Sequence, residues 1–179
     1  MFVLDDTMVV LVDVQGQLAQ LMHEKESLHR SLEILVQGAK LLGVPIVWME
    51  QIPSKIGPTL ECLSRHLGGQ SPIAKHSFSC CGEPEFLRAL EELDRKQVVL
   101  CGIESHICVF QTAHDLLAQG YEVQVLEDCV SSRTRENKEV GVNRIRQLGG
   151  EVTSVEMFFF EMMRDTENKA FRDVVKLIK

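Results

Sequence analysis

The chain has 179 residues, of which 45% are hydrophobic and 25% are charged, a composition typical of a soluble globular protein. Its formal net charge of −7 and the absence of any lysine or arginine run disfavour binding to nucleic acid or anionic lipid. No apolar run reaches the roughly 18 residues of a membrane span, and the first residues carry Asp5, Asp6 and Asp13 in place of the basic flank of a signal peptide. We therefore expect one cytoplasmic domain over residues 1–179.

Short apolar runs alternate with stretches in which apolar residues recur three or four apart, as in a parallel sheet covered by helices. Strands are expected at residues 7–13, 44–49, 71–78, 98–101, 121–126 and 152–155. Helices are expected at residues 27–42, 84–93, 107–117 and 134–148, the last with Val140, Ile145 and Leu148 on its inner face. Loops or turns are expected at 50–58 and 127–133, and segments 157–163 and 171–178 are expected to cover the end of the sheet.

Cys108 lies at the first turn of the helix predicted after the strand at 98–101. Ligands of open parallel sheets bind beyond the carboxyl ends of the strands, and the amino end of a helix lowers the pKa of a nearby thiol. This position suits a nucleophile. From position alone, however, a small buried apolar residue is favoured, since that is the usual role of a free cysteine.

Two charged side chains also stand at the ends of predicted strands. Asp13 ends the first strand, where it either caps a turn or serves a site, and Gln15 follows close enough to orient it. Lys75 lies near the end of the third strand, but lysine is usually a solvated surface residue. Six cysteines are present, and the adjacent Cys80 and Cys81 match neither a redox pair nor a zinc knuckle. In a reducing compartment most of these thiols should be free.

Four segments in register over nearly the whole chain resemble the isochorismatase-like cysteine hydrolase family, which includes nicotinamidases, N-carbamoylsarcosine amidohydrolases and isochorismatases. They are VVLVDVQ, IAKHSFS, GIESHICVFQTAHDLLAQGYEVQVLEDCVSS and GGEVTSVE. Within that family, GIESHICV, EQIPSKIGPT and VEMFFFEMMRD are most similar to small isochorismatase-domain proteins. Together with the strand pattern, the resemblance implies a three-layer α/β/α, Rossmann-like domain whose six-stranded parallel sheet has the order 3-2-1-4-5-6.

The resemblance also implies a catalytic triad of Cys108, Asp13 and Lys75. Cys108 would attack a carbonyl carbon, Asp13 would take the thiol proton and return it to the departing amine, and Lys75 would stabilise the thiolate. The family's cis peptide before the cysteine falls at Ile103–Glu104. The same resemblance gives the amides of Ile107 and Cys108 an oxyanion-binding role. Candidates for lining the substrate pocket are Gln15, Gln51, Phe78, Glu104 and His106.

Two departures from the family narrow the expected chemistry. Metal-dependent nicotinamidases carry Asp and His ligands after the second strand, whereas Glu50, Gln51, Ile52 and Pro53 stand here, so we expect neither a catalytic metal nor another cofactor. Isochorismatases proper often lack the cysteine, since cleavage of a vinyl ether needs no thiol. The presence of Cys108 therefore favours hydrolysis of an amide or related C–N bond.

The leading interpretation is a cysteine hydrolase that acts on the C–N bond of a small molecule. The alternatives are a non-catalytic binding or scaffold protein of the same fold and an isochorismatase-type vinyl-ether hydrolase. Relatives commonly form dimers or larger rings, and residues 157–163 hold more apolar side chains than one covering segment needs. We therefore expect a homo-oligomer.

Overall fold

The computed structural model describes residues 1–179 and contains one six-stranded parallel sheet in the order β3-β2-β1-β4-β5-β6. The predicted strand order is confirmed. The strands are β1 (Thr7–Val12), β2 (Ile46–Gln51), β3 (Ile73–Lys75), β4 (Gln97–Ile103), β5 (Glu122–Ser131) and β6 (Glu151–Thr153). Every residue of β1, β2 and β4 is buried, which explains why these strands are nearly continuous apolar runs.

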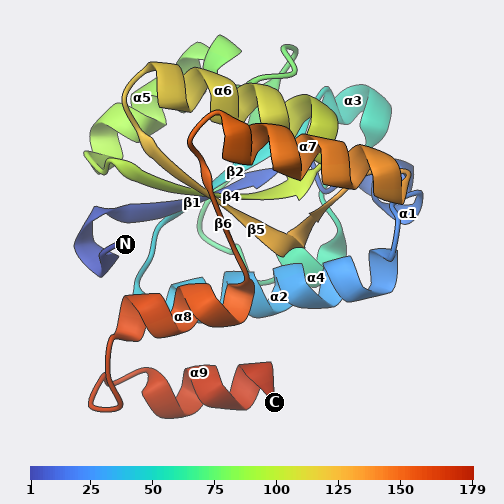
Figure 1. Ribbon diagram of the computed structural model, residues 1–179. Helices are drawn as coiled ribbons and strands as arrows, with labels where there is room; N and C mark the ends of the chain where they lie inside the picture. The colour runs from blue at the N-terminus through green and yellow to red at the C-terminus, as the bar shows by residue number, and fades with distance from the viewer.

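Helices cover both faces of the sheet (Figure 1). One face carries α2 (Lys25–Leu42) and α8 (Val155–Met163), and the other carries α5 (Pro84–Leu93), α6 (Phe110–Ala118) and α7 (Arg135–Gln147). Alternate residues of β1 point to opposite faces: Val9 and Leu11 join the apolar cluster under α2 and α8, whereas Met8 and Val10 join the cluster under α5 and α6. The protein thus has three layers, as predicted.

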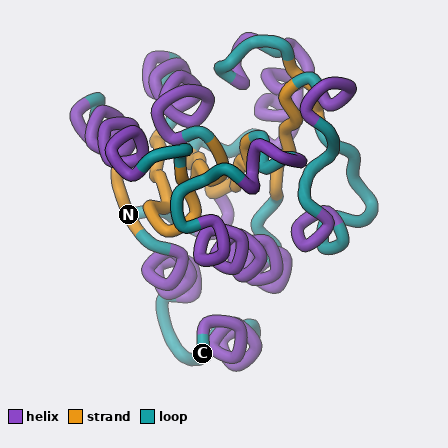
Figure 2. Tube along the Cα trace, turned by 90° about the vertical axis from the view of Figure 1, so that its right-hand side faces the viewer, coloured by secondary structure: helices purple, strands orange, loops and turns teal.

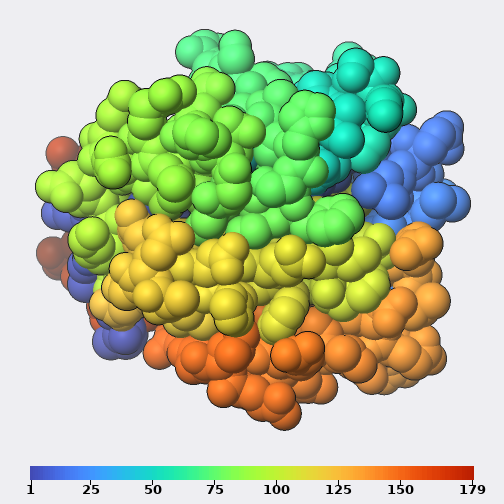
Figure 3. Space-filling view, turned by 90° about the horizontal axis from the view of Figure 1, so that it is seen from above, coloured from blue at the N-terminus to red at the C-terminus, as the bar shows by residue number.

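Two short helices lie at the carboxyl ends of the strands, α1 (Gly16–Gln20) and α3 (Pro53–Ile56), and a third, α4 (Glu61–Ser64), packs on α2. Viewed from the side on which α1 lies in Figure 1, the helices stand above and below the strands (Figure 2). From above, α5, α6 and α7 form a continuous surface, with α1 and α3 at its rim (Figure 3). The short 3₁₀ helices are η1 (Leu4–Asp6) and η2 (Cys80–Gly82). No helix of the chain is both long and apolar enough to span a membrane.

The structure corrects several boundaries. The turn predicted at residues 127–133 is mostly strand, because β5 resumes pairing with β4 after an irregularity, with Val130 opposite Gly102 and Ser131 opposite Ile103. The loop predicted at 50–58 is the end of β2 followed by α3. The last helix, α9 (Phe171–Ile178), packs on α2 and α8 and not on the end of the sheet.

The predicted inner face of α7 is wrong in part. Ile145 is buried, but Val140 is 53% exposed and Leu148 is 41% exposed. The inward face is centred on Gly141, whose backbone lies so close to the turn after β4 that an added Cβ would stand 2.5 Å from the Ser105 carbonyl carbon. Close packing of two backbones therefore sets the rotation of α7, and a count of apolar residues does not detect it.

Candidate active site

Asp13, Lys75 and Cys108 meet at the carboxyl edge of the sheet, although they come from three different strands. Asp13 directly follows β1, Lys75 ends β3, and Cys108 lies in the turn after β4. The Lys75 ammonium Nζ lies 2.7 Å from Asp13 Oδ2, and the two side chains are 0% and 1% exposed. Cys108 is 8% exposed. Since β2 separates β3 from β1 in the sheet, it is the length of the lysine side chain that brings its charge to Asp13.

The Lys75 ammonium has four oxygen acceptors. Besides Asp13, it donates to Gln51 Oε1 at 2.6 Å and to the backbone oxygens of Phe78 and Ser77 at 3.1 and 3.2 Å. Because three protons share four acceptors, the buried ammonium is fully hydrogen-bonded, as a charge without contact to water requires. Its position is fixed by β1, β2 and the segment after β3 together.

The second carboxylate oxygen of Asp13, Oδ1, is buried and accepts no hydrogen bond of regular geometry. Burial raises the pKa of Asp13, while the charge and hydrogen bond of Lys75 and the neighbouring Cys108 thiol act in the opposite direction. Oδ1 is thus the oxygen left for the thiol, and the carboxylate is more basic than an exposed aspartate.

The thiol of Cys108 differs from its expected ionisation. Burial raises its pKa to about 12; the negative charge of Asp13 adds to this increase, and the positive charge of Lys75 opposes it. The predicted lowering by a helix amino end is therefore wrong for this structure, because loss of solvent outweighs any helix effect. The resting thiol is protonated at neutral pH.

Cys108 also sits in a different turn from the one predicted. Residues Ser105–Val109 form a short π-helix, η3, before α6 begins, and such turns are frequent at functional sites. The preceding Ile103–Glu104 peptide is cis. The Glu104 carbonyl accepts hydrogen bonds from the amides of Ile107 at 3.0 Å and Val109 at 3.2 Å. The Ile107 amide is thus occupied, contrary to its expected oxyanion role, and only the Cys108 amide remains a candidate for that role.

Two of the pocket candidates, Gln15 and Gln51, face the protein interior. Gln15 is 0% exposed and Gln51 is 7% exposed. Gln15 Nε2 donates to the Gly57 backbone carbonyl at 2.7 Å, and the backbone N–H of Gln51 donates to Gln15 Oε1 at 2.7 Å. Their polar atoms are therefore engaged by other protein groups.

The other three candidates differ in exposure and in hydrogen-bond partners. Phe78 is 56% exposed, and His106 Nδ1 lies 2.9 Å from Ser132 Oγ. The buried Glu104 carboxylate accepts from the backbone amide of Arg133 at 3.0 Å and from its Nε at 3.1 Å. Sequence reasoning missed Arg133, although its place after a strand that ends at the same edge was a usable signal.

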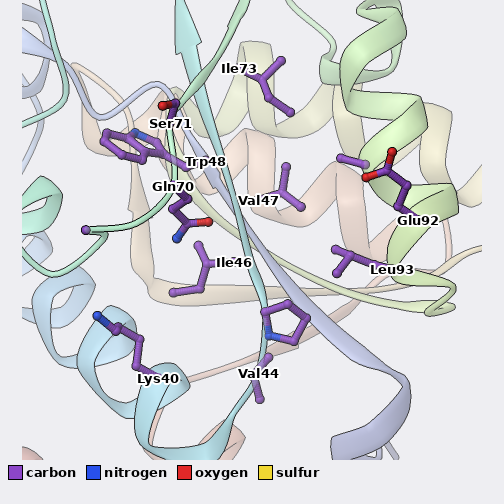
Figure 4. A pocket seen from close by; sticks show the side chains of 13 residues that line it. Lys40, Val44, Ile46, Val47, Trp48, Gln70, Ser71, Ile73, Glu92 and Leu93 are labelled. Carbon is purple, nitrogen blue, oxygen red and sulfur yellow. The ribbon is translucent and has the colours of Figure 1, made fainter.

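A cavity of about 390 Å³ lies elsewhere, beside the first half of β2 (Figure 4). Its lining includes Val44, Ile46 and Trp48, with Lys40 and Glu92 at its margin. None of the triad residues lines it. The buried charges and this cavity are therefore separate features of the structure.

The structure contains no group of three or more His, Cys, Asp or Glu side chains that are close enough together to hold a metal ion. Glu50, which stands where the family resemblance places metal ligands in nicotinamidases, is buried and engaged within the protein. Its Oε1 accepts from the Thr59 amide at 2.7 Å and from the Thr59 hydroxyl at 2.8 Å. The carboxylate anchors the segment after α3.

The three-layer fold, with an acid, a lysine and a thiol at the carboxyl edge of a parallel sheet, places the chain among α/β proteins whose sites lie at that edge. Residues 7–157 match the isochorismatase domain, and the chain belongs to the isochorismatase family, with its hydrolase fold. It is 38% identical over 178 residues to the secreted isochorismatase effector Isc1 of Phytophthora sojae, covering 97% of this chain and 84% of that protein.

Solved structures share the fold over almost the whole chain. A structure described as MAR1 ribonuclease from Caenorhabditis elegans has a TM-score of 0.93 and 29% identity, covering 99% of this chain and 91% of the other. The Escherichia coli YcaC gene product, described as an octameric hydrolase of unknown specificity, has a TM-score of 0.90 and 20% identity, covering 99% and 94%. The fold is therefore shared by proteins with different described roles.

Proposed function

We propose that this protein is a cysteine hydrolase that cleaves an amide or related C–N bond of a small molecule through Cys108, Asp13 and Lys75. The observation that carries the proposal is the buried Asp13–Lys75 pair, whose free carboxylate oxygen is left for the Cys108 thiol. A buried ion pair contributes little net stability. A protein that only binds or scaffolds has no need to place such a pair beside a thiol.

The high pKa of Cys108 is compatible with this role, because the proton does not have to leave the site. Transfer from Cys108 to Asp13 converts a thiol and a carboxylate into a thiolate and a carboxylic acid. The net charge stays the same, with the Lys75 ammonium beside both forms. Burial penalises a gain of net charge, so it opposes this internal transfer far less than it opposes loss of the proton to water.

The reaction then proceeds in two stages. The Cys108 sulfur attacks the carbonyl carbon, and the C–N bond breaks as Asp13 gives its proton to the departing nitrogen. This leaves a thioester and a free amine. Water next loses a proton to Asp13 and attacks the thioester, which releases a carboxylic acid and restores the thiol. The Cys108 amide is the remaining candidate for holding the carbonyl oxygen as it becomes negative.

The experiment is to incubate the protein with a panel of amides, ureides and carbamoyl compounds, and to measure released amine or ammonia. Turnover should disappear in Cys108→Ala. The unfolding free energy should stay within about 1–2 kcal/mol of the wild type, since little buried volume is lost. Cys62→Ala is the matched control and should keep full activity. Turnover that persists in Cys108→Ala would refute the thiol mechanism.

The role of Asp13 has its own measurement in turnover at pH 7. Asp13→Asn removes the proton acceptor and should lower turnover about a hundredfold or more, whereas Cys62→Ala should turn over at the wild-type rate. Iodoacetamide labelling does not separate this effect, because loss of the Asp13 charge also lowers the pKa of Cys108. Equal turnover in Asp13→Asn and wild type would contradict proton transfer to Asp13.

The ribonuclease name of the Caenorhabditis elegans neighbour makes RNA cleavage a contrasting hypothesis. We favour a small substrate without nucleic acid or membrane, because the net charge of −7 opposes binding to a phosphate backbone. An RNA substrate added to the same panel should remain intact.

Assembly and compartment are part of the same proposal. We propose a homo-oligomer, supported by the octameric Escherichia coli neighbour and by exposed Met157 and Phe160 on α8. We also propose a cytoplasmic location, which six free cysteines would suit. The Phytophthora relative is named as secreted, so membership of the family does not fix the compartment. Fractionation of cells that express the protein would test the location.

A further inference from the structure

We propose that Gln51 is a positioning residue that holds the Lys75 ammonium against Asp13, and that Gln15 in turn holds Gln51. This assignment differs from the substrate contacts expected for both residues, and it rests on the proposed function. Three observations support it: the two hydrogen bonds of the Gln51 side chain, the hydrogen bond from the Gln51 backbone to the Gln15 side chain, and the burial of both side chains.

The Gln51 side chain is fixed at both polar ends. Its Oε1 accepts from Lys75 Nζ at 2.6 Å, and its Nε2 donates to the His76 carbonyl at 2.8 Å. Rotating the amide by half a turn would set its NH₂ group against the ammonium and its oxygen against a carbonyl. Both contacts would then be repulsive. Only one orientation of the amide satisfies the site.

The backbone of Gln51 is held from the side of β1. The backbone N–H of Gln51 donates to Gln15 Oε1 at 2.7 Å. Gln15 Nε2 in turn donates to the backbone carbonyl of Gln51 at 3.2 Å and to that of Gly57 at 2.7 Å. On its other side, Gln51 lies opposite Lys75 in the pairing of β2 with β3. A continuous series of hydrogen bonds thus runs from the end of β1 through Gln51 to the lysine.

An amide suits this position because it is a neutral acceptor. It fixes the ammonium without cancelling its charge and without competing with Asp13 for the thiol proton. A carboxylate would cancel part of the ammonium charge and would compete with Asp13 for the thiol proton. Without any acceptor, the ammonium would keep Asp13 and two carbonyls but would lose the partner that holds it from the β2 side. The titratable groups that face this site are Asp13, Glu50 on β2, Lys75 on β3, Cys80 in η2 and Cys108 in η3.

The test measures iodoacetamide labelling of Cys108 in the full chain between pH 6 and pH 10 by mass spectrometry. Gln51→Leu should slow labelling at pH 7 about tenfold, the loss expected for a hydrogen bond to a charged group. Gln51→Glu restores an acceptor but adds negative charge. It should therefore move the rising part of the pH profile to higher pH by about one unit, which lowers the labelling rate about tenfold at each pH. Gln147→Leu, on the exposed end of α7, is the control and should match the wild type.

A merely structural role for Gln51 would change stability but not the pH profile. If Gln51→Leu does not fold, the profile of Gln51→Glu decides, and an unchanged profile overturns the assignment. Loss of turnover in Asp13→Asn combined with wild-type labelling profiles in both Gln51 variants overturns the positioning role alone. Unchanged turnover in Asp13→Asn overturns the proposed mechanism and this inference together.

Discussion

Replacing Lys75 by methionine tests the buried charge pair most directly. Methionine has a similar length and is apolar, so Lys75→Met removes the ammonium while leaving little empty space. The Asp13 carboxylate, 1% exposed and previously 2.7 Å from the ammonium, is then left buried without its partner. Removing one member of a buried pair costs about 3–5 kcal/mol. That is a third or more of the unfolding free energy of many domains.

The loss should depend on pH in a defined direction. Burial already raises the pKa of Asp13 against the opposing effect of Lys75, so the pKa rises further once that charge is gone. A carboxyl whose pKa is higher in the folded than in the unfolded protein stabilises the fold below its unfolded pKa, and this stabilisation disappears as pH rises through the folded value. Lys75→Met should therefore be closest to wild type in acid and lose most at pH 8.

Urea unfolding at pH 5 and pH 8 measures both quantities. Lys55→Met, an exposed lysine on α3, should stay within about 0.5 kcal/mol of wild type at both values. The double variant Asp13→Asn/Lys75→Met should be more stable at pH 8 than Lys75→Met, since no charge remains buried. If Lys75→Met loses less than about 1 kcal/mol of unfolding free energy at pH 8, and the loss does not depend on pH, the reasoning is refuted.

Two further predictions concern packing and assembly. Gly141→Ala should reduce the unfolding free energy by about 1–3 kcal/mol in urea titrations, because its Cβ would press on the Ser105 backbone. Gly68→Ala, which has open space, should be neutral, and equal stability of the two variants would contradict the packing argument. Met157→Glu should lower the mass measured by light scattering, since Met157 is 64% exposed on α8. A monomeric wild type at micromolar concentration would contradict the expected homo-oligomer.

The sequence predicted the strands and main helices because their apolar patterns are strong. Helix α5 begins and ends at the predicted residues, and β1 differs by one residue. The errors arise where a backbone contact overrides the pattern. Gly141 turns α7 toward η3, and the segment predicted as a turn at 127–133 continues as strand because Val130 and Ser131 pair with β4. Neither contact leaves a periodic signal in the residues concerned.

The candidate site was less predictable from the sequence than the fold. Strand ends placed Asp13, Lys75 and Cys108 at one edge, but only the family resemblance combined the three into a catalytic triad. The raised pKa of Cys108 was missed because it depends on burial by distant segments and not on its helix. The roles of Gln15 and Gln51 were missed for a similar reason, since hydrogen bonds across three strands are not encoded in spacing along the chain.

The separation of β3 from β1 accounts for the form of the site. A lysine on a strand adjacent to β1 would reach the Asp13 carboxylate only with its side chain folded back. Lys75 instead crosses the end of β2, and its ammonium must be held by whatever β2 presents there, which is Gln51. Every group that holds the charge therefore belongs to a buried strand end or to the backbone that follows one. Because protein groups hold the charges, in the proposed mechanism binding energy is not needed to assemble them and remains free to act on the reacting carbonyl.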